Sequence, residues 1–244
     1  DRRNATHQNS AQRALVLTVR FQAGEKLSAF SRAVKSINKE MLIKATAVTN
    51  LTDARYYAAK EVDYLGFNLE EGTEGYLDPM YMKAIREWVT GPHIVGEFST
   101  LPVSHVKAAA DFFGLDAVQL SAEKHMADLS QLAGLEIILR LNGGQDKAVL
   151  AESMQHAAPY VSCFLLDFSS VNDWESKLNE DPGFWNNLFD LRPTLLQASF
   201  SAEQLSPLFE TLNFAGISLV GGEEEMVGVK SFDQIEEIFE AFGL

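Results

Sequence analysis

Cysteine, basic charge and long apolar runs are all scarce in this sequence. Its 244 residues include a single cysteine, Cys163, which excludes an internal disulfide and favours a reducing compartment. No segment approaches the roughly 18 consecutive apolar residues of a membrane-spanning helix. The first residues also lack the basic and then apolar pattern of a secretory signal. These absences together predict a soluble, cytoplasmic protein.

Basic residues are outnumbered by acidic ones. The chain has 20 Lys and Arg against 34 Asp and Glu, a formal net charge of −14. Nucleic acids and anionic membranes attract proteins through basic patches. The charge balance therefore speaks against both as partners, and we expect a small-molecule ligand instead.

The charge is divided unevenly along the chain. Residues 1–40 carry 8 Lys and Arg against 3 Asp and Glu, or +5, which leaves −19 for residues 41–244. The change falls at Met41, directly before the first strand-like run. We expect residues 1–40 to be an N-terminal extension, either disordered or upstream of a natural start at Met41, and residues 41–244 to form one domain. A basic arm that binds a partner is the other interpretation.

Short apolar runs alternate with amphipathic segments from Met41 onward. Helical spacing is clearest at residues 106–113, at 205–212 behind a capping box from Ser201 to Gln204, and at 235–242 behind Ser231. Eight apolar runs follow one another at the spacing of repeated strand–helix units. They span residues 41–46, 62–67, 93–98, 116–120, 136–141, 160–167, 193–198 and 215–220.

Two architectures accommodate such units. A closed (β/α)8 TIM barrel takes all eight strands, near the lower size limit of that fold. A doubly wound open sheet would place a glycine fingerprint after the first strand, and the sequence there, ATAVTN (45–50), has no glycine. We therefore predict an α/β protein with a single-domain (β/α)8 TIM barrel.

The strand ends carry a family resemblance. Six segments resemble motifs of the phosphoribosylanthranilate isomerase family, in the family's order. They are IKATAVTNLTDA (43–54) for VKICGxTNxxDA, VDYLGFNL (62–69) for ADxxGFxF, EGYLDP (74–79) for SxRYxSP, VGEFS (95–99) for VGVFV, LDAVQLSA (115–122) for LDxVQLHG, and FLLDF (164–168) for LLDS. The resemblance runs from about residue 42 to the C-terminus. It implies a TIM barrel related to tryptophan biosynthesis.

That family catalyses an Amadori rearrangement, in which a general acid opens the ribose ring and a general base removes the C2 proton. The resemblance places the acid at Asp167 and the base, a cysteine in the family, at Thr46. A thiol has a reference pKa of about 8.5, whereas a threonine hydroxyl does not ionise at comparable cost. We expect Thr46 to hold substrate or water, and Cys163 to be packed in the interior. A turn cap is the other interpretation of Asp167.

The resemblance also implies groups that bind the substrate phosphate, and most of these groups are missing from this sequence. The family has glycine-rich loops after its last three strands, because backbone amides form anion-binding nests there. Here the sixth and seventh loops lack these glycines, Gly75 takes an arginine position and Ser121 a histidine position. Gly221 and Gly222 remain in the eighth loop, but three glutamates follow them and repel a phosphate.

Polar residues within the predicted strands complete the candidate site. Lys44 shares a face with Thr46 and is expected to point into the barrel. Glu97 takes an apolar position of the family motif. If it points inward it forms a buried pair with Lys44, and otherwise it pairs on the surface. The predicted substrate-binding residues are Lys44, Asn50, Gln119, Arg140, Gly221 and Gly222.

No signature of a metal or cofactor is present. The sequence has no HExxH, CxxC, Walker or GxSxG motif, and its five histidines show no metal-ligand spacing. We predict no cofactor, no metal, and a small molecule, phosphorylated or not, at the barrel mouth.

Three functional hypotheses remain open, because a fold does not determine a function. The first is an isomerase-like barrel that has lost the Amadori reaction and persists as a binding or scaffold protein. The second is a divergent but active phosphoribosylanthranilate isomerase with Asp167 as general acid. The third is a different reaction on an uncharged or non-phosphorylated ligand at the same barrel mouth.

Overall fold

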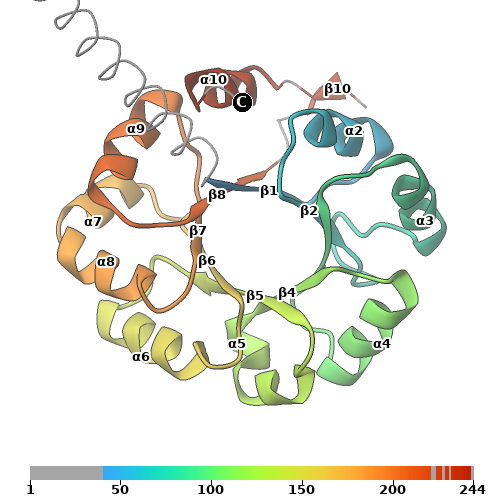
Figure 1. The fold of residues 1–244 in the computed structure, drawn as a ribbon, viewed down its shortest axis with the longest axis horizontal. Coiled ribbons are helices and arrows are strands. Elements are labelled where there is room, and N and C mark those ends of the chain that lie inside the picture. The colour runs from blue at the N-terminus through green and yellow to red at the C-terminus, as the bar shows by residue number, and fades with distance from the viewer. Residues whose placement is uncertain (1–40, 221–223, 227–228, 231, 243–244) are drawn as a thin grey trace, which may run out of the picture. The chain divides into compact units, whose positions relative to one another are not determined.

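A closed barrel of parallel strands forms the centre of the molecule (Figure 1). The computed structural model describes residues 41–220, 224–226, 229–230 and 232–242. The strands pair in sequence order, and the last pairs with the first to close the barrel. They are β1 (Leu42–Thr46), β2 (Tyr64–Asn68), β3 (His93–Phe98), β4 (Ala117–Ser121), β5 (Glu136–Asn142), β6 (Cys163–Asp167), β7 (Thr194–Gln197) and β8 (Gly216–Val220).

Helices lie between the strands and surround the barrel in Figure 1. They are α2 (Leu51–Ala59), α3 (Pro79–Trp88), α4 (Val103–Phe113), α5 (Ala122–His125), the 3-10 helix η1 (Met126–Leu132), α6 (Lys147–Ala157), α7 (Trp174–Asn179), α8 (Pro182–Phe189), α9 (Ala202–Thr211) and α10 (Asp233–Phe242). The predicted TIM barrel is confirmed, with every strand within three residues of its expected bounds.

Helix starts follow from local hydrogen bonds. The Asn50 side chain accepts from the Asp53 amide at 2.9 Å and so caps α2. Ser201 and Gln204 form the predicted capping box at the start of α9. The predicted N-cap Ser231 and the predicted extension over residues 1–40 lie outside the described residues.

Two features of the chain had no counterpart among the predicted elements. Two short helices, α7 and α8, follow β6 in place of one. A two-stranded antiparallel sheet of β9 (Glu224–Met226) and β10 (Val229–Lys230) follows β8. Strands this short carry too few residues for an alternation pattern to be visible in the sequence.

The barrel interior is polar near the carboxyl ends of the strands and apolar farther from them. A buried cluster of Val95, Ala117, Ile138, Cys163, Leu165 and Leu195 fills the apolar part. Cys163 is 3% exposed, so its predicted interior position is confirmed. The inward positions nearer the carboxyl ends of the strands hold polar side chains instead. This change of polarity places the candidate site at the carboxyl end of the barrel.

No helix within the described part of the chain is long and apolar enough to cross a membrane.

Candidate active site at the barrel mouth

The carboxyl ends of the parallel strands converge on one face, where barrel active sites lie. Two cavities lined by described residues open there. The smaller, of about 210 Å³, is lined by residues of β1, β2, β3, β4, β5 and β7 and of the loops that follow them. The larger, of about 430 Å³, lies over β4, β5 and β6. Ser121 and Arg140 line both cavities, so the two are neighbouring parts of one mouth.

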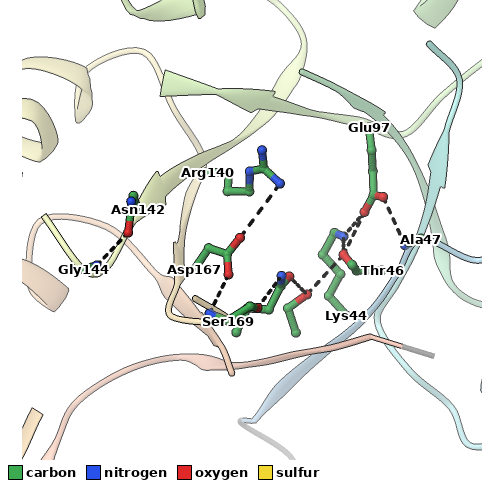
Figure 2. Close-up of polar contacts among 11 residues, drawn as sticks. Lys44, Thr46, Ala47, Glu97, Arg140, Asn142, Gly144, Asp167 and Ser169 are labelled. Carbon is green, nitrogen blue, oxygen red and sulfur yellow. Dashed lines mark hydrogen bonds and ion pairs between the residues drawn. The ribbon is translucent and has the colours of Figure 1, made fainter. Parts of the chain in front are cut away.

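A buried ion pair joins Lys44 of β1 to Glu97 of β3 (Figure 2). Lys44 has no exposed surface, and Glu97 is 9% exposed and lines the smaller cavity. The inward orientation of Glu97, left open by the sequence, is thereby settled in favour of the buried pair. Burial lowers the pKa of Lys44 below its usual value, and the neighbouring Glu97 carboxylate opposes that shift.

The Thr46 hydroxyl is fully engaged by its neighbours. It donates to Glu97 Oε1 at 2.8 Å, and it accepts from Lys44 Nζ and from Ser218 Oγ, the latter at 3.2 Å. A hydroxyl has one proton and two lone pairs, so the proton of Thr46 goes to Glu97, while Lys44 and Ser218 lie on its acceptor side. Thr46 therefore belongs to a structured polar cluster on the inner wall of the mouth.

Backbone geometry beside Thr46 supports the same cluster. Ala47 has a φ of 52°, in the left-handed region that costs a residue with a Cβ more than a glycine. The family motif has glycine at this place. The Ala47 amide donates to Glu97 Oε2 at 3.1 Å, and this bond helps to hold the turn. Both Glu97 oxygens thus accept hydrogen bonds.

The cluster extends across the barrel toward β6. The single hydroxyl proton of Ser218 in β8 is shared between two acceptors, Thr46 Oγ1 and Gln197 Oε1 of β7, the latter 3.1 Å away. Gln197 Nε2 donates to Ser169 Oγ at 3.3 Å. Ser218 is fully buried, and Gln197 is 6% exposed. A continuous series of hydrogen bonds therefore leads from Glu97, through Thr46, to the loop that follows Asp167.

Asp167 lies at the end of β6 and lines the larger cavity. Its Oδ1 accepts from the Ser169 amide at 2.9 Å, and its Oδ2 lies 3.9 Å from Arg140 Nη1 (Figure 2). The first contact is the turn cap considered from the sequence. The second brings the carboxylate to the mouth, so a structural and a binding use of Asp167 are both compatible with its position.

Gln119 of β4 lines the smaller cavity and is 6% exposed. Its Oε1 is buried and has no hydrogen-bond partner within the described part of the chain. Buried side-chain acceptors are rarely left in this state, because desolvation without a partner is costly. Gln119 is therefore a position at which a bound ligand would supply a missing contact.

The predicted site residues divide into three groups. Lys44, Thr46, Gln119, Arg140 and Asp167 come together at the mouth. Asn50 is the N-cap of α2 and is not among the residues that line these two cavities, and its substrate-binding role stays a prediction. Gly221 and Gly222 lie outside the described residues.

Two members of the polar cluster, Gln197 and Ser218, were not predicted from the sequence. Gln197 ends the buried strand TLLQ, and Ser218 is the polar side chain within the buried strand GISLV. A polar residue at an inward position of a buried strand is the signal that would have pointed to them. Within the described residues, no group of three or more His, Cys, Asp or Glu side chains is arranged to hold a metal ion.

Comparison with known proteins identifies a family. The family model for N-(5'-phosphoribosyl)anthranilate (PRA) isomerase matches residues 43–241. The curated isomerase of Saccharomyces cerevisiae is 23% identical over 212 residues, covering 80% of this chain and 91% of the yeast protein.

Solved structures show the same fold. The phosphoribosylanthranilate isomerase of Thermotoga maritima superposes with a TM-score of 0.65 at 21% identity, over 84% of this chain and all of that one. An isomerase structure in complex with reduced 1-(o-carboxyphenylamino)-1-deoxyribulose 5-phosphate gives 0.65 at 22% identity, with the same coverage of both chains. Since the family model covers most of the sequence, the chain belongs to the N-(5'-phosphoribosyl)anthranilate isomerase family.

Proposed function

We propose that this chain binds a small molecule at its barrel mouth and does not catalyse the Amadori rearrangement. The observation that carries the proposal is the hydrogen bonding of Thr46, which occupies the position of the family's general base. Its single hydroxyl proton is donated to Glu97 Oε1 at 2.8 Å. A threonine hydroxyl does not ionise at a cost comparable with a thiol, and the Lys44 ammonium that also bonds to Thr46 is already paired with Glu97. Thr46 is therefore unsuited to take a proton from a substrate carbon.

Among the described residues, neither Glu97 nor Cys163 is placed to take over the role of base. Both oxygens of Glu97 accept hydrogen bonds from Lys44, Thr46 or the Ala47 amide, and the carboxylate is paired with the buried Lys44 ammonium, so these internal partners already engage it. Burial raises the pKa of the Cys163 thiol to about 12, and the thiol lies in the apolar part of the barrel. A thiolate is thus not available near neutral pH.

Growth of a tryptophan auxotroph that lacks the isomerase provides the test. We expect no growth from the wild-type gene, and no turnover by the purified chain. Thr46→Cys is the matched variant, because it restores the family's residue while leaving Asp167 and Arg140 unchanged. Growth supported by the wild-type gene would refute the proposal.

A divergent, active isomerase is the second candidate. It is favoured by one observation, the place of Asp167 at the end of β6 within the mouth. The related isomerase structure in complex with reduced 1-(o-carboxyphenylamino)-1-deoxyribulose 5-phosphate supports this alternative, because that protein binds a phosphorylated small molecule. On this alternative, Asp167 protonates the ribose ring oxygen as general acid, in a cytoplasmic step of tryptophan biosynthesis. Asp167→Asn would then abolish turnover.

A further inference from the structure

We infer that the barrel mouth takes an unphosphorylated, polyhydroxylated ligand, a free sugar or polyol. The inference rests on the proposed ligand-binding function and narrows the class of ligand. Three features of the described residues carry it. They are the charge of the cavity lining, the unpartnered amide of Gln119, and the geometry of the pair formed by Arg140 and Asp167.

The lining of the mouth is poor in positive charge. Of the described residues that line the two cavities, Arg140 is the one cation, whereas the carboxylates are Glu74, Glu97, Glu123 and Asp167. Lys44 lies behind the wall and neutralises Glu97. A phosphate group carries about −1.5 to −2 charges near neutral pH. It would meet net repulsion from this lining, and an uncharged ligand would not.

The side-chain amide of Gln119 is suited to hydrogen bonding with a hydroxyl group of a ligand. Its oxygen is buried without a partner, and a half-turn about its last bond exchanges the oxygen with the NH2 group. The atom that faces the cavity is therefore an acceptor in one orientation and a donor in the other. A hydroxyl donates one hydrogen bond and accepts others, so it can bond to Gln119 in either orientation.

Arg140 and Asp167 form a loose pair with unused hydrogen-bonding atoms. Their nearest nitrogen and oxygen are 3.9 Å apart, beyond hydrogen-bond distance, and the side chains are 38% and 22% exposed. The guanidinium offers donors and the carboxylate offers acceptors, side by side at the mouth. Two adjacent hydroxyls of a sugar present the complementary acceptor and donor. This pair therefore suits a neutral diol.

The size of the smaller cavity agrees with a single sugar unit. Its volume is about 210 Å³, below the roughly 300–1,000 Å³ of sites for drug-sized ligands. The larger cavity is adjacent to it, since Ser121 and Arg140 line both. A ligand seated on Gln119 would thus extend toward Asp167.

Ligand-observed NMR on the full chain tests the inference. The probes are D-ribose, ribitol, D-ribose 5-phosphate and inorganic phosphate, each at the same ionic strength. We expect ribose or ribitol to bind, and ribose 5-phosphate to bind about tenfold more weakly or not at all. Gln119→Met and Arg140→Met should each weaken sugar binding by about tenfold while retaining side-chain volume.

The control variant is Thr90→Val. Thr90 lines a third cavity, of about 510 Å³, at the opposite end of the barrel beside the starts of β1, β2 and β3. Sugar binding should be unchanged in this variant, because the inference places the ligand at the mouth. Urea denaturation of all three variants establishes that each is folded under the binding conditions.

Three results would overturn the inference. They are tighter binding of ribose 5-phosphate than of ribose, unchanged sugar binding in Gln119→Met, and no binding of either unphosphorylated probe at millimolar concentration. The proposed function fails by a different measurement, growth of the tryptophan auxotroph. A chain that restores growth refutes the loss of isomerase activity, whatever the sugar experiment shows.

Discussion

Glu97 occupies space that is available only because residue 66 is glycine. A Cβ added to Gly66 would lie against Glu97 Oε1 and within 2.6 Å of Lys44 Nζ. The buried ion pair thus depends on a missing side chain on the neighbouring strand β2. Asn68, further along β2, pairs in register with Glu97 itself.

Gly66→Ala should therefore lower the free energy of unfolding by about 1–3 kcal/mol, the usual cost of overpacking a core. The two side-chain ends that it would displace are buried and bonded to each other, so neither has a free alternative position. Gly183→Ala in α8 is the matched control, since its Cβ would meet nothing nearer than 3.6 Å. Urea denaturation of both variants checks this, and equal stability would contradict the account of Gly66.

Glu97→Val should destabilise the fold more strongly, by about 3–5 kcal/mol, because it leaves the Lys44 ammonium buried without a counter-ion. The double variant Lys44→Met with Glu97→Val removes both charges and should recover most of that loss. A double-mutant cycle measured by urea denaturation separates the coupling from the two single effects. Additive losses would show that the pair is not coupled.

Glu70 should make stability depend on acid pH. Burial raises the pKa of this carboxyl, but hydrogen bonds from Thr100 and Ser99 outweigh burial and lower it below its ordinary value of 4.5. The Ser99 amide donates at 2.6 Å and the Thr100 amide at 3.0 Å. A lowered folded pKa means that the stabilisation is present above pH 4.5 and is lost as the pH falls through the folded value.

Glu70→Gln should accordingly cost about 1.5–3 kcal/mol at neutral pH, and the difference from wild type should shrink in acid. Unfolding free energies measured at a series of pH values check both statements. Glu71→Gln, at an exposed neighbouring position, is the control and should change stability little. A difference that stays constant into acid would show that the Glu70 charge is not what stabilises the loop.

Cys163 should resist alkylation in the folded protein. It is 3% exposed, and burial raises its pKa to about 12, so almost no thiolate is present at pH 8. Iodoacetamide should modify the thiol only after unfolding, as followed by mass spectrometry with and without urea. Labelling of the native chain at a rate near that of the unfolded chain would contradict the interior position.

Much of the fold could be predicted because each strand and helix carries a local signal. The eight apolar runs and the capping box from Ser201 to Gln204 were visible without any tertiary information. Motif order at the strand ends was sufficient to indicate the family. The position of Asp167 at the mouth followed from its place at the end of β6.

The contacts within the site could not be predicted in the same way. Thr46 and Glu97 are 51 positions apart, and Thr46 and Ser218 are 172 apart. Strand pairing sets which residues share a layer of the barrel, and a shift of one residue would turn a side chain to the other face. Asn50 illustrates the limit, because its place in a family motif did not reveal that its side chain caps α2.

The sequence by itself determined the barrel, the family and the loss of the family's base, since these depend on residue type and order. Only the tertiary structure decided that Glu97 points inward, that Lys44 donates to Thr46, and that Gln119 Oε1 lacks a partner among the described residues. The physical reason is that hydrogen bonds and ion pairs depend on distances between strands. Those distances arise only when the barrel closes.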